Sequence, residues 1–496
     1  MKSIKYILGI SAVLALGSCD KKLDLYPYSS IEITQSFKTM ADAKAWDNAF
    51  YSALRGRVYG SYAIGQDVQA DYLNASLDYG NRNGNPHRWG TSFLASDGLL
   101  SGVWLGYYSA LKDINLCIEK LPTIPTTTTA EADQLKRYIG DAYLARAYYY
   151  SELVVRFADA YTPASASTDL GVPLVLTYDI NAMPARATMA EVYTQIQADI
   201  DLAKANITAA GAAGANLFNK DVITALEARV KLNKQDWQGA LTAANTLVTA
   251  ATYPLITSQA TLQNMWTNDF GQETIFQVFV SRPNELSNAN SIYWGYNPAN
   301  GKYTPDFIPT QSIINLYDNA DIRKGVYFRT LPVIVQGVDY TNIALVSKYP
   351  GNPSLYVGNT NYAQAPKIFR VAEQYLIAAE AAAQLGGANE ATALTRLNAL
   401  RTARGLTALT GLTGTPLMTA IQEERTRELA FEGFRLWDLK RWHLGFTRGT
   451  PQNLGPIQQG ANFNLLTIAA DDDKFTWGIP QNDATINPNI VQNSGW

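Results

Sequence analysis

Aromatic and polar side chains are concentrated in two stretches of this 496-residue chain, residues 58–100 and 252–366, which interrupt its helical pattern. An indole or phenol ring offers an apolar face for stacking, while amide and guanidinium groups donate hydrogen bonds. On that chemistry we predict a ligand-binding site with Trp89, Trp294 and Tyr296 as stacking platforms. Four neighbouring residues are expected to supply polar contacts: Tyr79, Asn85, Arg88 and Asn290. The alternative for each residue is that it only packs its own loop.

Signals for catalysis and metal binding are weak. Glu424 and Glu428 could share a helix face, but a glycosidase needs one carboxyl protonated, and the arginines around this pair favour two ionised groups. The two histidines lack spaced partners for zinc, and residues 471–473 lack the alternating acids and glycine of a calcium loop. No nucleophile elbow, phosphate-binding loop or dinucleotide fingerprint occurs in a suitable context. We therefore predict a protein that is not an enzyme, with no metal and no cofactor.

The first residues have the pattern of a secretory signal. Lys2 and Lys5 precede an apolar stretch too short to span a bilayer, and Gly17 and Ser18 stand directly before Cys19. Small residues before a cysteine are typical of bacterial lipoprotein processing, so we predict a signal peptide over 1–18 and lipidation of Cys19. An ordinary signal peptide with an incidental cysteine is the alternative. Acyl chains would tether the mature chain to a membrane while its body stays in water.

Composition limits the possible partners. The chain has 40 basic and 43 acidic residues, and this mildly acidic balance argues against nucleic acid, which requires a basic face. Of the two cysteines, Cys117 would have no disulfide partner if Cys19 carries lipid. Its place on an apolar helical face predicts a buried thiol.

Apolar residues at helical spacing predict helices over much of the chain. These are residues 37–57, 101–121, 130–157, 189–205, 219–233, 236–250, 370–385, 389–404 and 418–444. Thr188 and Glu191 have the spacing of a capping box, and Asn389 is a plausible cap after Gly386-Gly387. Clustered alanines in 370–404 allow close helix packing, which suits stacked helical pairs of tetratricopeptide type. A strand is expected over Glu273–Val280.

These patterns predict a mainly α fold. A tetratricopeptide-like scaffold of helical pairs is expected at roughly 37–57, 101–250 and 367–447. An irregular, loop-rich subdomain with short strands is expected at roughly 58–100, 252–366 and 448–496. Residues 19–36 would form a lipidated tether, and residues 37–496 a single domain. Long irregular stretches in a compact protein are often functional.

Several long motifs resemble those of the SusD/RagB family. Residues 370–381 resemble its R-x-A-E-x-Y-L-I-x-A-E-A helix, and residues 424–442 its E-R-x-x-E-L-x-F-E-G-x-R-x-x-D-L-x-R-W helix. Trp477-Gly-Ile-Pro480 and residues 487–496 are similar to the family ending, with Gly478, Ser494 and Trp496 as small departures. The segment from Cys19 to Pro27 and the motif Trp104-x-x-x-Tyr108-x-x-Leu-x-x-Ile-Asn115 also fit. The motifs follow the family's order along the mature chain.

The resemblance implies a lipoprotein of the bacterial outer membrane that faces the cell exterior and has about four tetratricopeptide-like units. It implies binding of oligosaccharide or polysaccharide and delivery to a SusC-like TonB-dependent transporter. One alternative is a mainly structural subunit of the transporter complex, and another is a receptor for a different nutrient such as peptide. The charges of 424–441 are expected to pair along one helix rather than to bind ligand.

Overall fold

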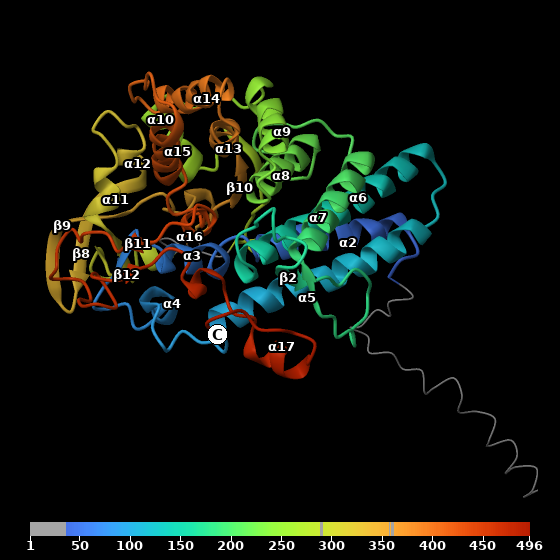
Figure 1. The fold of residues 1–496 in the computed structure, drawn as a ribbon, viewed down its shortest axis with the longest axis horizontal. Coiled ribbons are helices and arrows are strands. Elements are labelled where there is room, and N and C mark those ends of the chain that lie inside the picture. Colours follow the sequence, from blue (N-terminus) through green and yellow to red (C-terminus); the bar gives the residue numbers. More distant parts are fainter. Residues whose placement is uncertain (1–35, 288–290, 357, 359–361) are drawn as a thin grey trace, which may run out of the picture.

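The computed structural model describes residues 36–287, 291–356, 358 and 362–496. It is mainly helical, with short strands, and this confirms the predicted fold class. The longer helices are α2 (Met40–Arg55), α5 (Gly98–Lys120), α6 (Thr129–Phe157), α7 (Met189–Asn206), α8 (Lys220–Asn233), α9 (Trp237–Thr249), α13 (Val371–Leu385), α14 (Asn389–Ala403) and α15 (Gly414–Glu428). Consecutive helices pack as neighbours, as in α6–α7, α8–α9 and α13–α14 (Figure 1).

Capping side chains fix where several of these helices begin. The Thr188 side chain accepts a hydrogen bond from the backbone N–H of Glu191, and the Glu191 side chain accepts one from the backbone N–H of Thr188. The predicted capping box is therefore confirmed. The same arrangement starts α2 at Thr39 and α6 at Thr128. The predicted cap at Asn389 is wrong, because Ala388 occupies the cap position and makes no side-chain hydrogen bond there.

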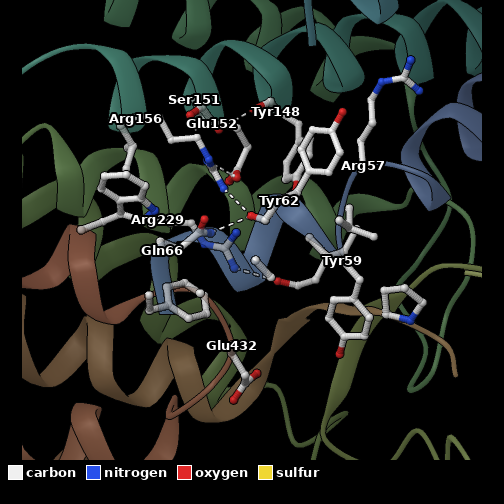
Figure 2. A pocket seen from close by; sticks show the side chains of 18 of the residues that line it. Arg57, Tyr59, Tyr62, Gln66, Tyr148, Ser151, Glu152, Arg156, Arg229 and Glu432 are labelled. Carbon is white, nitrogen blue, oxygen red and sulfur yellow. Dashed lines mark hydrogen bonds and ion pairs between the residues drawn. The ribbon is translucent and has the colours of Figure 1, made fainter. Parts of the chain in front are cut away.

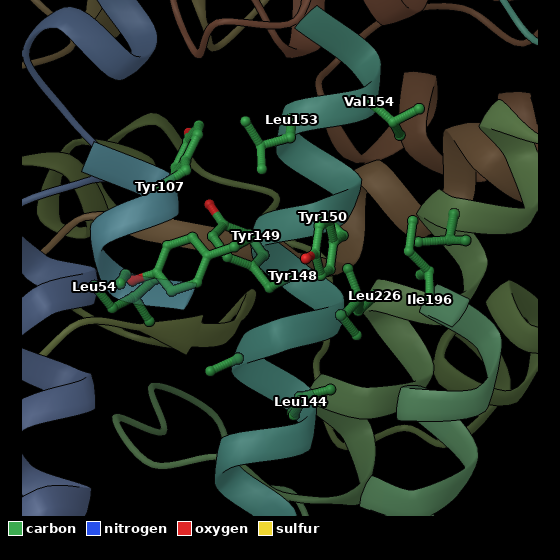
Figure 3. Close-up of a cluster of buried hydrophobic side chains, with 14 of the residues drawn as sticks. Leu54, Tyr107, Leu144, Tyr148, Tyr149, Tyr150, Leu153, Val154, Ile196 and Leu226 are labelled. Carbon is green, nitrogen blue, oxygen red and sulfur yellow. The ribbon is translucent and has the colours of Figure 1, made fainter. Parts of the chain in front are cut away.

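The buried clusters are formed mainly by apolar and aromatic side chains of the helices. Along α6, Tyr148, Tyr149 and Leu153 point into a buried cluster against the neighbouring helices (Figure 3). Cys117 is buried in the same cluster as a free thiol, as predicted. Fully buried alanines of α13 and α14 belong to a cluster that these helices share with α8, α9 and α15, which is consistent with close approach of helices: Ala378, Ala379, Ala381, Ala382 and Ala393.

The strands form small sheets. One sheet has the order β5 (Tyr296–Asn297), β6 (Lys302–Tyr303), β8 (Phe328–Val335) and β9 (Val338–Val346). The two-stranded sheets pair β1 (Leu73–Ala75) with β7 (Phe307–Pro309), β10 (Lys367–Arg370) with β4 (Thr274–Gln277), β2 (Leu170–Pro173) with β3 (Arg186–Thr188), and β11 (Phe446–Thr447) with β12 (Thr467–Ile468). The predicted strand at 273–280 is therefore present but shorter.

The two stretches expected to be irregular contain more structure than predicted. Their helices are α3 (Ser61–Gln69), α4 (Gly84–Arg88), α10 (Gln259–Thr267), α11 (Gln311–Asn315) and α12 (Lys324–Tyr327). The hairpin β8–β9 was also missed; its turn places Gln336 and Gly337 at φ of 50° and 75°. Both values lie in the left-handed region that favours tight hairpin turns.

The predicted helix over 418–444 is broken. The chain leaves α15 after Glu428 and begins α16 (Arg435–Arg441) only after Phe431 and Gly433, whose φ values are 64° and 81°. Helical φ is negative, so these two residues interrupt the helix. The last helix is α17 (Gln481–Ile486), beside the C-terminus (Figure 1). Residues 1–35, which include the predicted signal peptide, Cys19 and most of the tether, lie outside the described residues.

Candidate functional site

Three of the predicted polar residues meet in one hydrogen-bonded group around α4. The Arg88 guanidinium donates to the Tyr79 hydroxyl over 2.6 Å and to the Asn85 side-chain oxygen over 2.9 Å. The Asn85 amide in turn donates to Asp97 over 2.9 Å. Asn85 also lines a depression of about 230 Å³ together with Asn81. Tyr79 itself is buried, whereas Asn81, Asn85, Arg88 and Asp97 are at least partly exposed.

Trp89 and Trp294 do not lie where we predicted. Trp89 is 7% exposed, donates to the Gln69 carbonyl over 2.6 Å and packs edge-on against Phe446 and Phe475. Trp294 is 6% exposed and donates to the Val346 carbonyl over 2.7 Å. The two indoles belong to separate hydrophobic clusters. The prediction that they are sugar platforms is wrong, because each large ring is already buried against its own core.

Tyr296, in contrast, is half-buried and belongs to a group of partly exposed tyrosines. We call this group the tyrosine cluster: Tyr296, Tyr303, Tyr356 and Tyr362. Tyr296 and Tyr303 face each other across β5 and β6 with ring centres 5.0 Å apart. The Tyr296 backbone N–H donates to the Tyr362 hydroxyl over 2.8 Å. Tyr356 and Tyr362 both lie close to Gly351.

Trp294 supports this cluster from beneath. Its ring centre lies 5.4 Å from that of Tyr303 and 6.2 Å from that of Tyr362, both in edge-on contact. Packing of this kind holds the phenol rings in place. Trp294 thus positions the residues above it rather than offering a face of its own.

Two arginines border the cluster. The exposed Arg329 places its guanidinium carbon 5.5 Å from the Trp294 ring centre, and Arg282 donates to the Tyr356 carbonyl over 2.6 Å. Burial raises the pKa of Tyr303 although Arg329 opposes this, so its hydroxyl remains protonated at neutral pH. The cluster therefore combines apolar ring faces, phenol hydroxyls and guanidinium groups, which can stack on and hydrogen-bond a polar molecule.

The sequence pattern singled out Tyr296, but not the other three tyrosines of the cluster or Arg329. Asn290 lies outside the described residues. The dipeptide Asn300-Gly301 is a hairpin-turn signal between Tyr296 and Tyr303 and could have paired them. Nothing in the local sequence indicates that Tyr356 and Tyr362 belong to the same cluster as Tyr296 and Tyr303.

The two predicted loop regions lie side by side. Strand β1 pairs with β7, and the Arg82 side chain forms an ion pair with Asp306, with Nε and Oδ2 2.7 Å apart. The tip of the β8–β9 hairpin also reaches the first region, where the Gln336 N–H donates to Asp78 over 2.9 Å. These contacts join the group around α4 to the sheet that carries the tyrosine cluster.

The charged residues of 424–441 are mostly buried instead of lying along a solvated helix face. We call their central group the charged core: Glu273, Arg323, Arg370, Arg404, Glu424 and Glu428. Glu428 accepts hydrogen bonds from Arg323, Arg370 and Arg404 at 2.8 to 3.0 Å. The expected pairing along one helix is thus replaced largely by pairing between distant segments.

This environment also bears on the glycosidase alternative. Burial alone would raise the pKa of Glu428, but Arg404 and Arg370 hold it well below its usual range. Burial likewise opposes ionisation of Glu424, yet Arg323 and Arg427 keep its pKa low. Both carboxylates are therefore ionised, as predicted, and neither can act as the general acid that glycoside hydrolysis requires.

Comparison with known proteins gives consistent matches along the chain. A family model described as starch-binding associating with outer membrane matches residues 23–232, and the SusD family model matches residues 340–496. A SusD-like protein of Formosa agariphila is 27% identical, with 99% of this chain and 98% of that protein covered.

Solved structures show the same fold. A SusD superfamily protein from Bacteroides thetaiotaomicron has a TM-score of 0.78 at 24% identity, covering 92% of this chain and 99% of that one. A protein from Bacteroides vulgatus described as a putative sugar binding protein has a TM-score of 0.77 at 24% identity, covering 93% and 99%. At these identities the likeness concerns the fold alone.

Proposed function

We infer that this chain, which belongs to the SusD family, binds oligosaccharide at the cell surface and delivers it to a SusC-like TonB-dependent outer-membrane transporter. The proposal takes the protein to be an outer-membrane lipoprotein anchored through Cys19, with its body facing the cell exterior. Family membership supports carbohydrate binding and association with the outer membrane. The glycan, the transporter and the anchor are parts of the proposal.

The observation that carries the proposal is the tyrosine cluster. A sugar ring has an apolar face of C–H groups and a rim of hydroxyls, which match phenol faces and phenol and guanidinium donors. Burying about 60 Å² of apolar surface on one ring contributes roughly 1.5 kcal/mol at about 25 cal/mol per Å². Two or three rings with hydrogen bonds would give affinities of roughly micromolar to millimolar. Such modest affinity allows release to a transporter.

The test is a double substitution, Tyr296→Ala with Tyr303→Ala, in the soluble form that begins after Cys19. Glycan arrays would identify a ligand for the unchanged protein, and calorimetry would then compare affinities. Loss of two stacking faces should weaken binding by at least about tenfold. Tyr143→Ala, a half-buried tyrosine on α6, is the matched control and should bind normally. Equal affinity of the double variant and the control would remove the cluster from the binding site.

The anchor can be tested separately from the ligand. Cys19→Ser should abolish incorporation of a labelled fatty acid and release the protein from the outer membrane. Protease added to intact cells should digest the anchored protein if its body faces outward. Unchanged membrane association of the variant would contradict anchoring through Cys19.

An apolar groove of about 360 Å³ favours the alternative of a mainly structural subunit. It lies between α5, α17 and the segment 180–184, and is bordered by strongly exposed apolar side chains: Leu105, Ile180, Met183 and Ile486. Exposed apolar patches commonly mark protein contacts. Tight co-purification with the transporter, together with failure of every glycan to bind, would support this role over capture.

A further inference from the structure

A cavity of about 90 Å³ lies between the longer helices and the loop that precedes α16, away from the tyrosine cluster. Its walls come from α3, α6 and α8, together with β10 and the segment around Glu432 (Figure 2). Partly exposed side chains border it, among them Arg57, Tyr62 and Glu152, and give it a route to solvent. One water needs about 10 to 15 Å³ on this measure, so the cavity has room for a small molecule of several atoms.

Four buried polar atoms that have no hydrogen-bond partner among the described residues belong to side chains lining this cavity. They are Gln66 Oε1, Arg156 Nε, Arg425 Nη1 and Trp437 Nε1. The four side chains are 2%, 3%, 3% and 8% exposed. A buried polar group without a partner is unfavourable, and such groups are normally satisfied by protein, water or ligand. Three donors and one acceptor thus belong to side chains that line one cavity.

The remaining atoms of these side chains hold them in place. Arg156 donates to Glu152 over 2.6 Å and to the Tyr62 carbonyl over 2.9 Å, and the Gln66 amide nitrogen donates to the same carbonyl over 2.6 Å (Figure 2). Arg425 uses its Nε to bind Asp438 over 2.7 Å. The unpartnered atoms of these three side chains are therefore fixed by contacts made elsewhere on the same groups, and rotation would break those contacts. The Trp437 ring is held by edge-on packing against Trp477, with ring centres 5.3 Å apart.

The charge around the cavity favours an anion. Its walls carry more cationic than acidic side chains: Arg57, Arg156, Arg229, Lys367 and Arg425 against Glu152, Glu432 and Asp438. Arg229 and Lys367 are paired outside the cavity wall, with Glu373 and Asp269. Arg57 donates to the backbone carbonyls of Gly106 and Ala53. Within the wall, Arg156 pairs with Glu152 and Arg425 with Asp438, while Glu432 pairs outside it with Lys348 and Arg370. The excess positive charge is therefore that of Arg57.

We propose that this cavity binds a small protonated oxyanion of the size of hydrogen phosphate, at a site independent of the proposed glycan site. The anion's oxygens would accept hydrogen bonds from Arg156, Arg425 and Trp437, as guanidinium and indole N–H groups are donors only. Its own O–H would donate to Gln66 Oε1, which cannot donate in return. This acceptor distinguishes hydrogen phosphate from sulfate, because sulfate carries no proton at neutral pH.

The experiment is titration of the purified mature chain with inorganic phosphate, and with sulfate at equal ionic strength, followed by calorimetry and melting temperature. We expect saturable heat and a raised melting temperature with phosphate, and an affinity for sulfate at least tenfold weaker. Absence of saturable phosphate binding, or equal binding of sulfate, would overturn the proposal and leave water as the partner of these atoms.

Variants locate the site. Trp437→Phe keeps an aromatic ring and removes one donor, so phosphate affinity should fall at least about fivefold. Trp442→Phe is the matched control, because its indole lies outside the cavity wall and donates to Glu380 over 2.8 Å. Gln66→Leu removes the acceptor, so the ratio of phosphate affinity to sulfate affinity should decrease. Equal phosphate affinity of the two tryptophan variants would place any bound phosphate elsewhere and overturn the assignment. Glycan binding by the Tyr296→Ala, Tyr303→Ala protein provides a separate readout for the proposed function.

Discussion

The charged core and the tyrosine cluster place polar side chains in opposite surroundings. Arg323, Arg404, Glu424 and Glu428 are fully buried and satisfy one another, whereas Tyr296 and its neighbours keep part of their surface in water. The charged core includes three residues of the long motifs, Arg370, Glu424 and Glu428. Its ion pairs join α15 and Arg370, which directly precedes α13, to the segments around Glu273 and Arg323. The tyrosine cluster has no motif. The motif residues therefore stabilise the fold, whereas the partly exposed rings of the proposed site lie outside any motif.

The largest expected effect comes from breaking the charged core. Glu428→Gln removes the charge that Arg323, Arg370 and Arg404 share, so buried guanidinium groups lose their main counter-charge. We expect a loss of about 5 kcal/mol in the free energy of unfolding, since unpairing one buried ion pair typically costs about 3 to 5 kcal/mol. Chemical denaturation measures this loss.

Glu423→Gln is the control for that substitution. Its side chain is 55% exposed and lies 3.7 Å from Arg427, so its removal should change stability by less than about 0.5 kcal/mol. Similar stability losses for the two variants would contradict the distinction between buried and solvated charges on α15.

The next effect concerns the two buried tryptophans. Trp89→Ala and Trp294→Ala should each lower the free energy of unfolding by about 4 kcal/mol, because each leaves a large cavity in a hydrophobic cluster. Thermal or chemical denaturation would show the loss. Trp294→Ala should also weaken glycan binding by releasing Tyr303 and Tyr362, whereas Trp89→Ala should leave binding by the folded fraction unchanged. A stable Trp294→Ala protein would indicate that the ring is not packed as described.

The helical part of the fold was predictable because its signals are local. Apolar spacing and the Thr188–Glu191 capping box depend on residues within a few positions of one another, and the start of α7 follows directly. The break between α15 and α16 was not predictable in this way. Phe431 adopts positive φ because the residues around it pack against distant segments, and its carbonyl accepts a hydrogen bond from Tyr349 over 2.7 Å.

The candidate site was less predictable because aromatic residues that are neighbours in the sequence differ in burial in the fold. Trp294 and Tyr296 are two positions apart, yet the first is buried and the second is half-exposed. Which ring faces water depends on β8 and β9, some thirty to fifty residues further along, and the sequence gives no local sign of that contact. Residue type directed the prediction to this region, and tertiary packing decides which of its rings are buried.

A smaller, pH-dependent effect is expected at Asp67, a buried carboxyl on α3. It accepts hydrogen bonds from the Gly433 N–H over 3.1 Å and the Tyr293 hydroxyl over 3.4 Å. Burial raises its pKa from 3.8 to about 8 although Gly433 and Lys348 oppose this. Between these two values the folded state holds a proton that the unfolded state releases, so this group makes the protein less stable as pH rises.

Asp67→Asn removes that titration. The free energy of unfolding of the variant minus that of the unchanged protein should increase by more than about 1 kcal/mol from pH 5 to pH 8. Denaturant titrations at several pH values measure the difference. Asp133→Asn, an exposed acid on α6, is the control and should show no such trend. A difference that stays constant from pH 5 to pH 8 would show that Asp67 is ionised throughout.

The smallest effect is expected in the helical part, where each signal acts locally. Thr188→Ala removes the hydroxyl that accepts from the Glu191 N–H and leaves that group at the start of α7 without its cap. The loss should be about 1 kcal/mol in the free energy of unfolding. Thr194→Ala, six residues further along the same helix and exposed, should change stability by less than about 0.5 kcal/mol. If Thr188→Ala were as damaging as Trp294→Ala, the start of α7 would depend on tertiary packing more than on its cap, and the contrast between local and distant determinants would not hold.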